Sequence, residues 1–129
     1  MGSGKTMISA GIGCRRGCPA TEIISVLREA EHQAGVLAEI LAAPAFKLTE
    51  PGLSEAAHIL GLPLIFIENP ELGAAQPSCF TRSGTVLAQT GLSSVAEASA
   101  LVASGRSARL LVPRITHPRA TCAIAVSAA

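Results

Sequence analysis

The chain lacks the residues with which several classes of protein recognise their partners. Its 129 residues include no Trp, no Tyr and only three Phe, which disfavours nucleic-acid modules that stack bases on aromatic rings. A formal net charge of +1 gives no basic surface for DNA or for a lipid headgroup layer. No apolar run approaches the roughly 20 residues that span a bilayer. We therefore expect neither a nucleic acid nor a membrane as a partner.

Asp is also absent, so nine Glu residues are the only acidic side chains. Mg²⁺ and Ca²⁺ sites usually draw on several carboxylates, which this composition hardly supplies. The four Cys and three His residues do not have the spacing of zinc ligands or of a compact disulfide framework. Because no signal peptide is recognisable, we expect reduced thiols, a cytoplasmic location, no metal and no cofactor.

Ala, Leu, Ile and Val dominate what is present, and 49% of the residues are hydrophobic. This length and composition fit one domain over residues 1–129 with one substantial core. The periodicity predicts strands over 7–12, 36–43, 62–67, 109–115 and 121–126, and helices over 19–34, 50–60 and 95–102. The order predicts an α/β fold, a three-layer α/β/α sandwich with a mixed, mostly parallel sheet of about five strands.

Local signals refine several of these elements. A helical interpretation of 36–43 stays open, and 68–84 is expected to be a loop with a short helix. Thr49 is expected to cap the second helix, with Pro51 in its first turn. The continuously apolar run 62–67 is typical of a central strand, and 109–126 is expected to form an antiparallel hairpin.

The most informative motif is Gly-Ile-Gly-Cys-Arg-Arg-Gly over 11–17, between the first strand and the first helix. A strand, a glycine-rich turn and a helix N-terminus together present free N–H groups and the positive end of a helix dipole. Arg15 and Arg16 add planar guanidinium groups suited to carboxylate or phosphate. The motif predicts recognition of an anionic small molecule.

Two nucleotide-binding interpretations of the N-terminal region fail on context. The segment 2–6 (Gly-Ser-Gly-Lys-Thr) ends like a phosphate-binding loop, but it lacks the preceding strand and precedes a strand rather than a helix. The dinucleotide pattern G-x-G-x-x-G is met by Gly11 and Gly13, but Arg16 stands at its third glycine position and Gly17 comes one residue late. We expect neither ATP, GTP nor a dinucleotide.

With further blocks added to that motif, the chain resembles the family of CobE and the C-terminal domain of CbiG, proteins of cobalamin biosynthesis. The blocks that carry the resemblance occur in family order over nearly the whole chain. They are 11–17, Lys47 with 50–53, 60–64, 90–91 with 94–98, and 121–125.

The resemblance implies an α/β/α fold and a role among corrin-ring intermediates. CbiG as a whole is associated with opening a lactone on a cobalt-precorrin, but its N-terminal portion has no counterpart in this sequence. The resemblance thus favours an accessory protein that binds a precorrin or related tetrapyrrole. The alternatives are a hydrolase or isomerase acting on a precorrin, and a module that docks another enzyme of the pathway.

Precorrins carry many carboxylates around an apolar macrocycle, so cations at the predicted carboxyl-end crevice are the natural ligand contacts. Each candidate also has a structural interpretation: a helix cap, a surface ion pair or solvation. Glu50 and Glu97 are the candidate general bases, and Arg114 and Thr121 are possible further contacts. The predicted ligand-binding residues are Gly11, Gly13, Arg15, Arg16, Gly17, Lys47, Thr90, Gly91 and Ser94.

Overall fold

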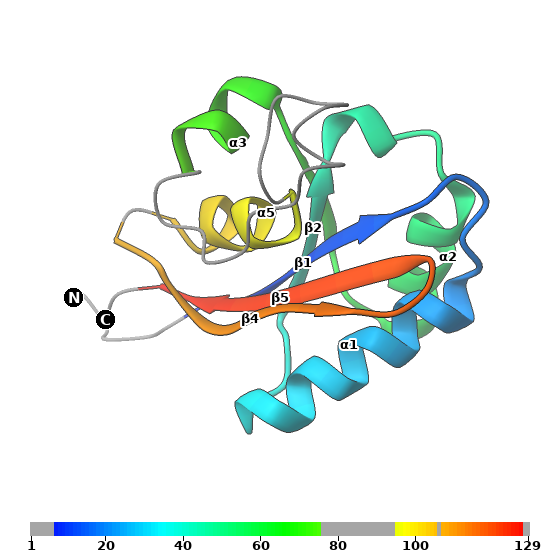
Figure 1. Cartoon of the computed structure of the whole chain (residues 1–129), viewed down its shortest axis with the longest axis horizontal. Coiled ribbons are helices and arrows are strands. Elements are labelled where there is room, and N and C mark those ends of the chain that lie inside the picture. The colour runs from blue at the N-terminus through cyan, green and yellow to red at the C-terminus, as the bar shows by residue number, and fades with distance from the viewer. Residues whose placement is uncertain (1–6, 76–94, 106, 128–129) are drawn as a thin grey trace.

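A five-stranded sheet with helices on both faces forms the framework (Figure 1). The structure, a computed structural model, describes residues 7–75, 95–105 and 107–127. The elements in chain order are β1 (Ile8–Cys14), α1 (Ala20–Ala34), β2 (Ile40–Pro44), the 3₁₀ turn η1 (Ala45–Lys47), α2 (Pro51–Leu60), β3 (Leu64–Ile67), α3 (Asn69–Ala75), α5 (Val95–Ser104), β4 (Arg109–Thr116) and β5 (Ala120–Val126).

The strand order is β3-β2-β1-β5-β4, with β1 at the centre. β1 pairs in parallel with β2, and β2 with β3, whereas β5 is antiparallel to both β1 and β4. Two pairings are thus parallel and two antiparallel, and every strand except β5 runs in the same direction. The predicted mixed α/β sheet is confirmed.

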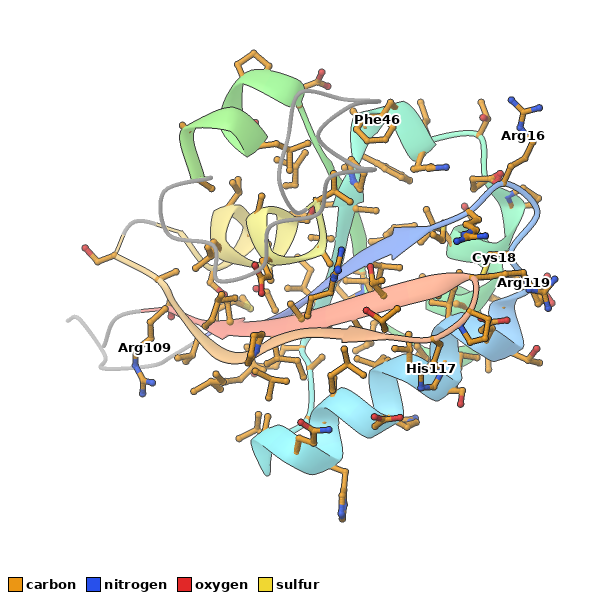
Figure 2. All side chains as sticks on the ribbon, viewed as in Figure 1. Arg16, Cys18, Phe46, Arg109, His117 and Arg119 are labelled. Atoms are coloured by element: carbon orange, nitrogen blue, oxygen red, sulfur yellow. The ribbon has the colours of Figure 1, made fainter. Side chains whose placement is uncertain are left out.

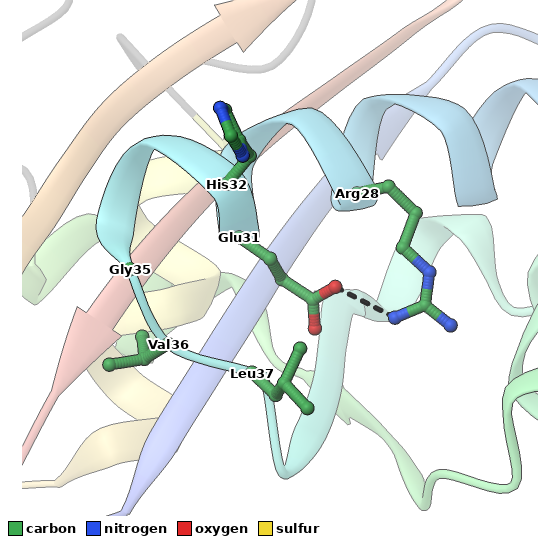
Figure 3. A pocket seen from close by; sticks show the side chains of 6 residues that line it. All are labelled: Arg28, Glu31, His32, Gly35, Val36 and Leu37. Carbon is green, nitrogen blue, oxygen red and sulfur yellow. Dashed lines mark hydrogen bonds and ion pairs between the residues drawn. The ribbon is translucent and has the colours of Figure 1, made fainter.

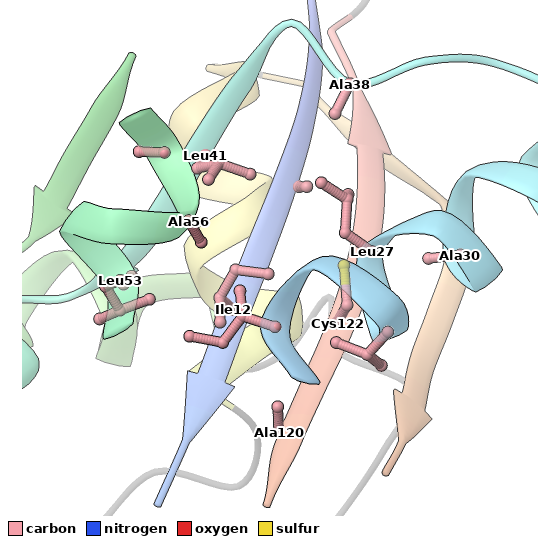
Figure 4. Packing of buried hydrophobic residues seen from close by; sticks show 14 of the residues in the cluster. Ile12, Leu27, Ala30, Ala38, Leu41, Leu53, Ala56, Ala120 and Cys122 are labelled. Carbon is pink, nitrogen blue, oxygen red and sulfur yellow. The ribbon is translucent and has the colours of Figure 1, made fainter. Parts of the chain in front are cut away.

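The helices form a layer on each face of the sheet. α1 and α2 pack together over one face, and their core includes Ile12, Leu27, Leu41 and Cys122 (Figure 4). α5 covers the other face across β1, β2 and β5, with α3 beside it. Burial of these two apolar faces supplies the main driving force for the fold.

Two glycines and one proline at the helix ends have the roles that the sequence predicted. α1 ends at Gly35 and α2 at Gly61, and both glycines have left-handed backbone angles that favour a residue without a side chain. Pro51 is the first residue of α2. The segment predicted as strand 36–43 does form a strand, but it begins only at Ile40.

The prediction that the apolar run 62–67 is a central strand is wrong, because β3 lies at the edge of the sheet. Its side chains are apolar on both faces because both faces are covered. Leu64 and Phe66 pack against the core under α1 and α2, whereas Ile65 and Ile67 pack with α3 and α5. A continuously apolar strand indicates that both of its faces are buried. An edge strand covered by helices on both faces meets this condition as well as a central strand does.

The C-terminal hairpin forms as predicted and is anchored to α1 by side chains. β4 and β5 are joined through His117, Pro118 and Arg119. His117 Nε2 lies 2.8 Å from Glu29 Oε1, and Arg119 Nε donates to Glu22 Oε1 at 3.0 Å. These contacts fix the hairpin tip beside α1 (Figure 2).

Two of the sequence interpretations concern residues outside the described ranges. Residues 2–6 lie there, and the first described element after Thr6 is the strand β1, with no helix following the segment directly. Thr90, Gly91 and Ser94 also lie outside the described residues. In the part that is described, every helix is too short or too polar to span a bilayer.

Candidate functional site

The turn that follows β1 lies at the carboxyl end of the parallel strands and leads into α1. Gly17 has a φ of +76°, which a residue with a side chain adopts only under strain. The Arg15 N–H donates to the Arg119 carbonyl at 2.9 Å, and the Cys18 N–H donates to the Arg15 carbonyl at 3.1 Å. The turn is therefore tied both to itself and to the tip of the hairpin.

A carboxylate of the protein itself accepts a hydrogen bond from another backbone donor of this turn. The Gly17 N–H donates to the two carboxylate oxygens of Glu50, at 3.1 and 3.0 Å. Glu50 occupies the N-cap position of α2, yet its side chain makes no capping hydrogen bond to that helix. The prediction that Thr49 caps α2 is wrong, because the helix begins one residue later and Glu50 is directed to the turn instead.

The structure brings Lys47 and Glu50 to the same edge as the turn, as the sequence predicted. The Glu50 N–H donates to the Lys47 carbonyl at 3.0 Å, so the segment after β2 closes on itself beside Gly17. Lys47 is half-buried, and its charge acts on Cys14 at the end of β1. Three chain segments therefore meet here: the turn, η1 with the start of α2, and the hairpin tip.

Positive charge predominates at this edge. Arg15 and Arg16 are exposed, and within the described residues neither of them nor Lys47 forms an ion pair. Figure 2 shows Arg16 pointing outward from the end of the molecule at which Arg119 also lies. Arg119 is already paired with Glu22, so Arg15, Arg16 and Lys47 are the cations available to a ligand. This set is called the cationic edge below.

Arg119 is a member of this neighbourhood that the sequence did not predict. It reaches the turn because β5 pairs with β1 in the register that sets Ala120 opposite Cys14. No motif in the chain specifies that pairing. A signal was nevertheless available, since a hairpin carrying His117 and Arg119 next to a helix carrying Glu22 and Glu29 has complementary charges.

The thiols near the turn are protonated at neutral pH. Burial raises the pKa of Cys14 to about 11, although the positive charge of Lys47 opposes part of that rise. Burial also raises the pKa of Cys18. Because the thiolate is the reactive form, these pKa values give both cysteines a packing role rather than a nucleophilic one.

Gly11 and Gly13 lie within β1 and allow α5 to pack closely against the sheet. A Cβ atom on Gly11 would overlap the Ala96 carbonyl oxygen and lie 2.6 Å from the Ala100 backbone nitrogen. A Cβ atom on Gly13 would lie 2.6 Å from Thr121 Oγ1. The packing of α5 is therefore sufficient to explain Gly11, and the Thr121 hydroxyl together with Val95 of α5 accounts for Gly13.

The N-terminal end of α5 holds a second group of polar residues that the sequence singled out. Glu97 is fully buried and accepts a hydrogen bond from the Arg114 N–H at 2.9 Å. Arg114 Nε is buried and has no hydrogen-bond partner among the described residues. Thr121 Oγ1 donates to the Gly13 carbonyl at 3.4 Å. This group links α5 to β1, β4 and β5.

A shallow hollow lies at the other end of the sheet and does not coincide with the cationic edge. It is lined by Arg28, Glu31, His32, Gly35, Val36 and Leu37 (Figure 3). The Glu31 carboxylate accepts hydrogen bonds from Arg28 Nη1 and from the Ala38 N–H, each at 2.8 Å. Its charged groups are thus engaged in holding the end of α1 to the segment before β2.

No group of three or more side chains suited to a metal occurs within the described ranges. The edge instead offers guanidinium and ammonium groups, which suit carboxylates.

Comparison with known proteins identifies the family of this chain. Residues 8–125 match the family model described as cobalamin synthesis G C-terminus. The chain belongs to this family.

Individual members agree with that assignment. The chain is 36% identical over 118 residues to Protein CobE of a Sinorhizobium species, covering 89% of this chain and 77% of that protein. It is also similar to a solved CobE structure from the cobalamin biosynthetic pathway, with a TM-score of 0.88 and 35% identity over 94% of this chain and 90% of that one.

Two further structures extend the similarity. The cobalamin biosynthesis protein chiG from Agrobacterium tumefaciens matches with a TM-score of 0.76 and 38% identity, covering 94% of this chain and 98% of that one. A cobalamin biosynthesis protein G homolog from Sulfolobus solfataricus shares the fold, with a TM-score of 0.71 and 23% identity over 93% of this chain and 36% of that one. The family member described here is thus a protein of cobalamin biosynthesis with the CobE-type fold.

Proposed function

We propose that this protein binds a polycarboxylate corrin-ring intermediate, a precorrin or a related tetrapyrrole, as an accessory component of cobalamin biosynthesis. The observation that carries the proposal is the cationic edge. Arg15, Arg16 and Lys47 all lie at the carboxyl end of the parallel strands, where α/β proteins usually bind ligands. Their charges lack ion-pair partners within the described residues, which leaves them available to carboxylates at the rim of a macrocycle.

The environments of the two candidate general bases support binding rather than hydrolysis. Glu50 accepts the Gly17 N–H with both carboxylate oxygens, and Glu97 is fully buried and accepts the Arg114 N–H. A general base needs direct or water-mediated access to the proton that it removes. Both carboxylates have structural hydrogen bonds that account for their positions, so the proposal assigns no catalytic step to them.

The proposal is tested by titrating the protein with hydrogenobyrinic acid, a metal-free corrin polycarboxylate, and following the visible absorption of the ring. Replacing Arg15 with Ala removes one charge-assisted contact, which we expect to weaken binding by about 1.5–3 kcal/mol. Raising the salt concentration should weaken binding by the wild-type protein and have less effect on the Arg15→Ala protein.

Arg109 provides a matched control, because it is exposed at the amino end of β4, far from Arg16 in Figure 2. The Arg109→Ala protein loses the same charge and should bind like the wild type. A ring spectrum that does not change with any of the proteins would refute the proposed function. Mass analysis of the recovered ring should find its mass unchanged, and a change in mass would replace the accessory role with an enzymatic one.

A further inference from the structure

Two exposed apolar side chains flank Lys47 beside the cationic edge. Phe46 is 43% exposed and Leu48 is 62% exposed, at the point where β2 gives way to η1. Isolated exposed apolar residues are common, but two within three residues next to unpaired cations form a surface of mixed character. This pair is called the apolar step below.

Backbone hydrogen bonds hold the apolar step in place near the turn. The Leu48 N–H donates to the Ala45 carbonyl at 3.0 Å, which closes the 3₁₀ turn. Glu50 then fixes the next residues by accepting the Gly17 N–H. Figure 2 shows Phe46 beyond the end of β2 and Arg16 at the end of the neighbouring turn, both on the same side of the molecule. A rigid apolar surface costs less conformational entropy on binding than a mobile one.

The positive charge of the cationic edge indicates which kind of molecule can bind on the apolar step. Arg15, Arg16 and Lys47 have no ion-pair partner in the part of the chain that the structure describes, so they disfavour a cationic partner and favour one that carries anions beside its apolar surface. A flat ring with carboxylates on its rim meets both requirements at once. A second copy of this chain would instead bring its own cationic edge close to this one.

We propose that Phe46 and Leu48 contact the apolar face of the bound tetrapyrrole, while the cationic edge holds carboxylates at its rim. This inference rests on the proposed function and deepens it by assigning a specificity determinant. The apolar step distinguishes a macrocycle from a small polycarboxylate, because only the macrocycle has a face to bury.

The test compares Phe46→Ala with the wild type in titrations with hydrogenobyrinic acid at low and high salt. We expect affinity to fall about tenfold, equivalent to about 1.4 kcal/mol, with an unchanged salt dependence because no charge is lost. Leu37→Ala is the matched control and should leave affinity unchanged. Leu37 is 70% exposed and lies before β2, at the amino end of the parallel strands and away from the cationic edge. Phe46→Leu should retain most of the affinity.

Competition with citrate, a small polycarboxylate without a ring, provides a second measurement. Citrate should inhibit binding to the wild-type and Phe46→Ala proteins with the same inhibition constant, because it contacts only the cations. If the alanine variant folds poorly, Leu48→Ser in the same titration should weaken ring binding and leave the citrate constant unchanged.

The outcomes separate this inference from the function on which it rests. Binding by the wild type together with unchanged affinity in Phe46→Ala and Leu48→Ser overturns the apolar contact alone. A Phe46→Ala change that alters the oligomeric state without altering ring affinity assigns the step to a second copy and also overturns the inference. Failure of the wild type to bind the ring overturns the proposed function, and the apolar contact with it.

Discussion

Replacing Gly11 with Ala tests whether this glycine belongs to the fold or to a ligand site. The added Cβ atom would overlap the Ala96 carbonyl oxygen and lie 2.6 Å from the Ala100 nitrogen and 3.0 Å from the Ala100 Cβ atom. The first two neighbours are helix backbone and cannot rotate away. Helix α5 would therefore have to move off the central strand.

The expected cost is the balance of two contributions. Overpacking a close-packed core typically costs about 1–3 kcal/mol, and displacement of backbone places Gly11 near the upper end of that range. Removing glycine from a strand interior returns about 0.5–1 kcal/mol. We expect a net loss of about 2 kcal/mol in the free energy of unfolding, or about 8 °C in Tm for a domain of this size.

Urea denaturation followed by circular dichroism, without any ligand present, measures this loss. Gly35→Ala is the comparison, because Gly35 has a φ of +74° and no neighbouring atom within 4 Å of an added Cβ. That variant should lose only about 1 kcal/mol from backbone strain. A Gly11→Ala protein as stable as the wild type would refute the packing argument and return Gly11 to the candidates for ligand contact.

Two further predictions concern buried ionisable groups. Glu31→Gln should lower the free energy of unfolding by about 1–2 kcal/mol, because the carboxylate accepts from Arg28 with one oxygen and from the Ala38 N–H with the other, whereas glutamine has a single acceptor oxygen. Arg28→Ala should cost less than 1 kcal/mol in the same urea assay, since Arg28 is 56% exposed, and equal losses would contradict this reasoning. Because burial raises the pKa of Cys14 from 9.0 to about 11, its contribution to stability is complete below pH 9 and is lost as pH rises toward 11. Urea midpoints between pH 8 and 11 should fall less steeply in Cys14→Ser, and an identical fall in both proteins would exclude this contribution.

Sequence patterns predicted those parts of the fold that depend on neighbouring residues. The helical spacing of α1 and α2, their glycine ends and Pro51 at the start of α2 are local signals, and the structure contains them as predicted. The position of β3 in the sheet is a tertiary property. Its apolar side chains indicate that both faces are buried but do not indicate how many strands flank it.

The contacts of Glu50 and Arg119 with the turn are tertiary in the same way, and local patterns do not specify them. From local sequence alone, a carboxylate at the start of a helix is expected only to cap that helix or to interact with its dipole. The Glu50 side chain instead bonds to Gly17, 33 residues earlier in the chain. Arg119 reaches the turn through the antiparallel pairing of β5 with β1, whose small residues, such as Gly11 and Gly13, do not specify a neighbouring strand.

Two backbone N–H groups of the turn already have hydrogen-bond partners within the protein, which affects the kind of anion that the cationic edge can recognise. A phosphate-binding loop holds its ligand with several free backbone N–H groups. In this turn, the Gly17 N–H is bound to Glu50 and the Arg15 N–H to the Arg119 carbonyl. With these two donors occupied, recognition relies mainly on the side chains of Arg15, Arg16 and Lys47, which are spread over two chain segments rather than gathered around one point. Separate cations match separate carboxylates better than one compact phosphate, so the same turn that resembles a nucleotide loop in sequence favours a polycarboxylate.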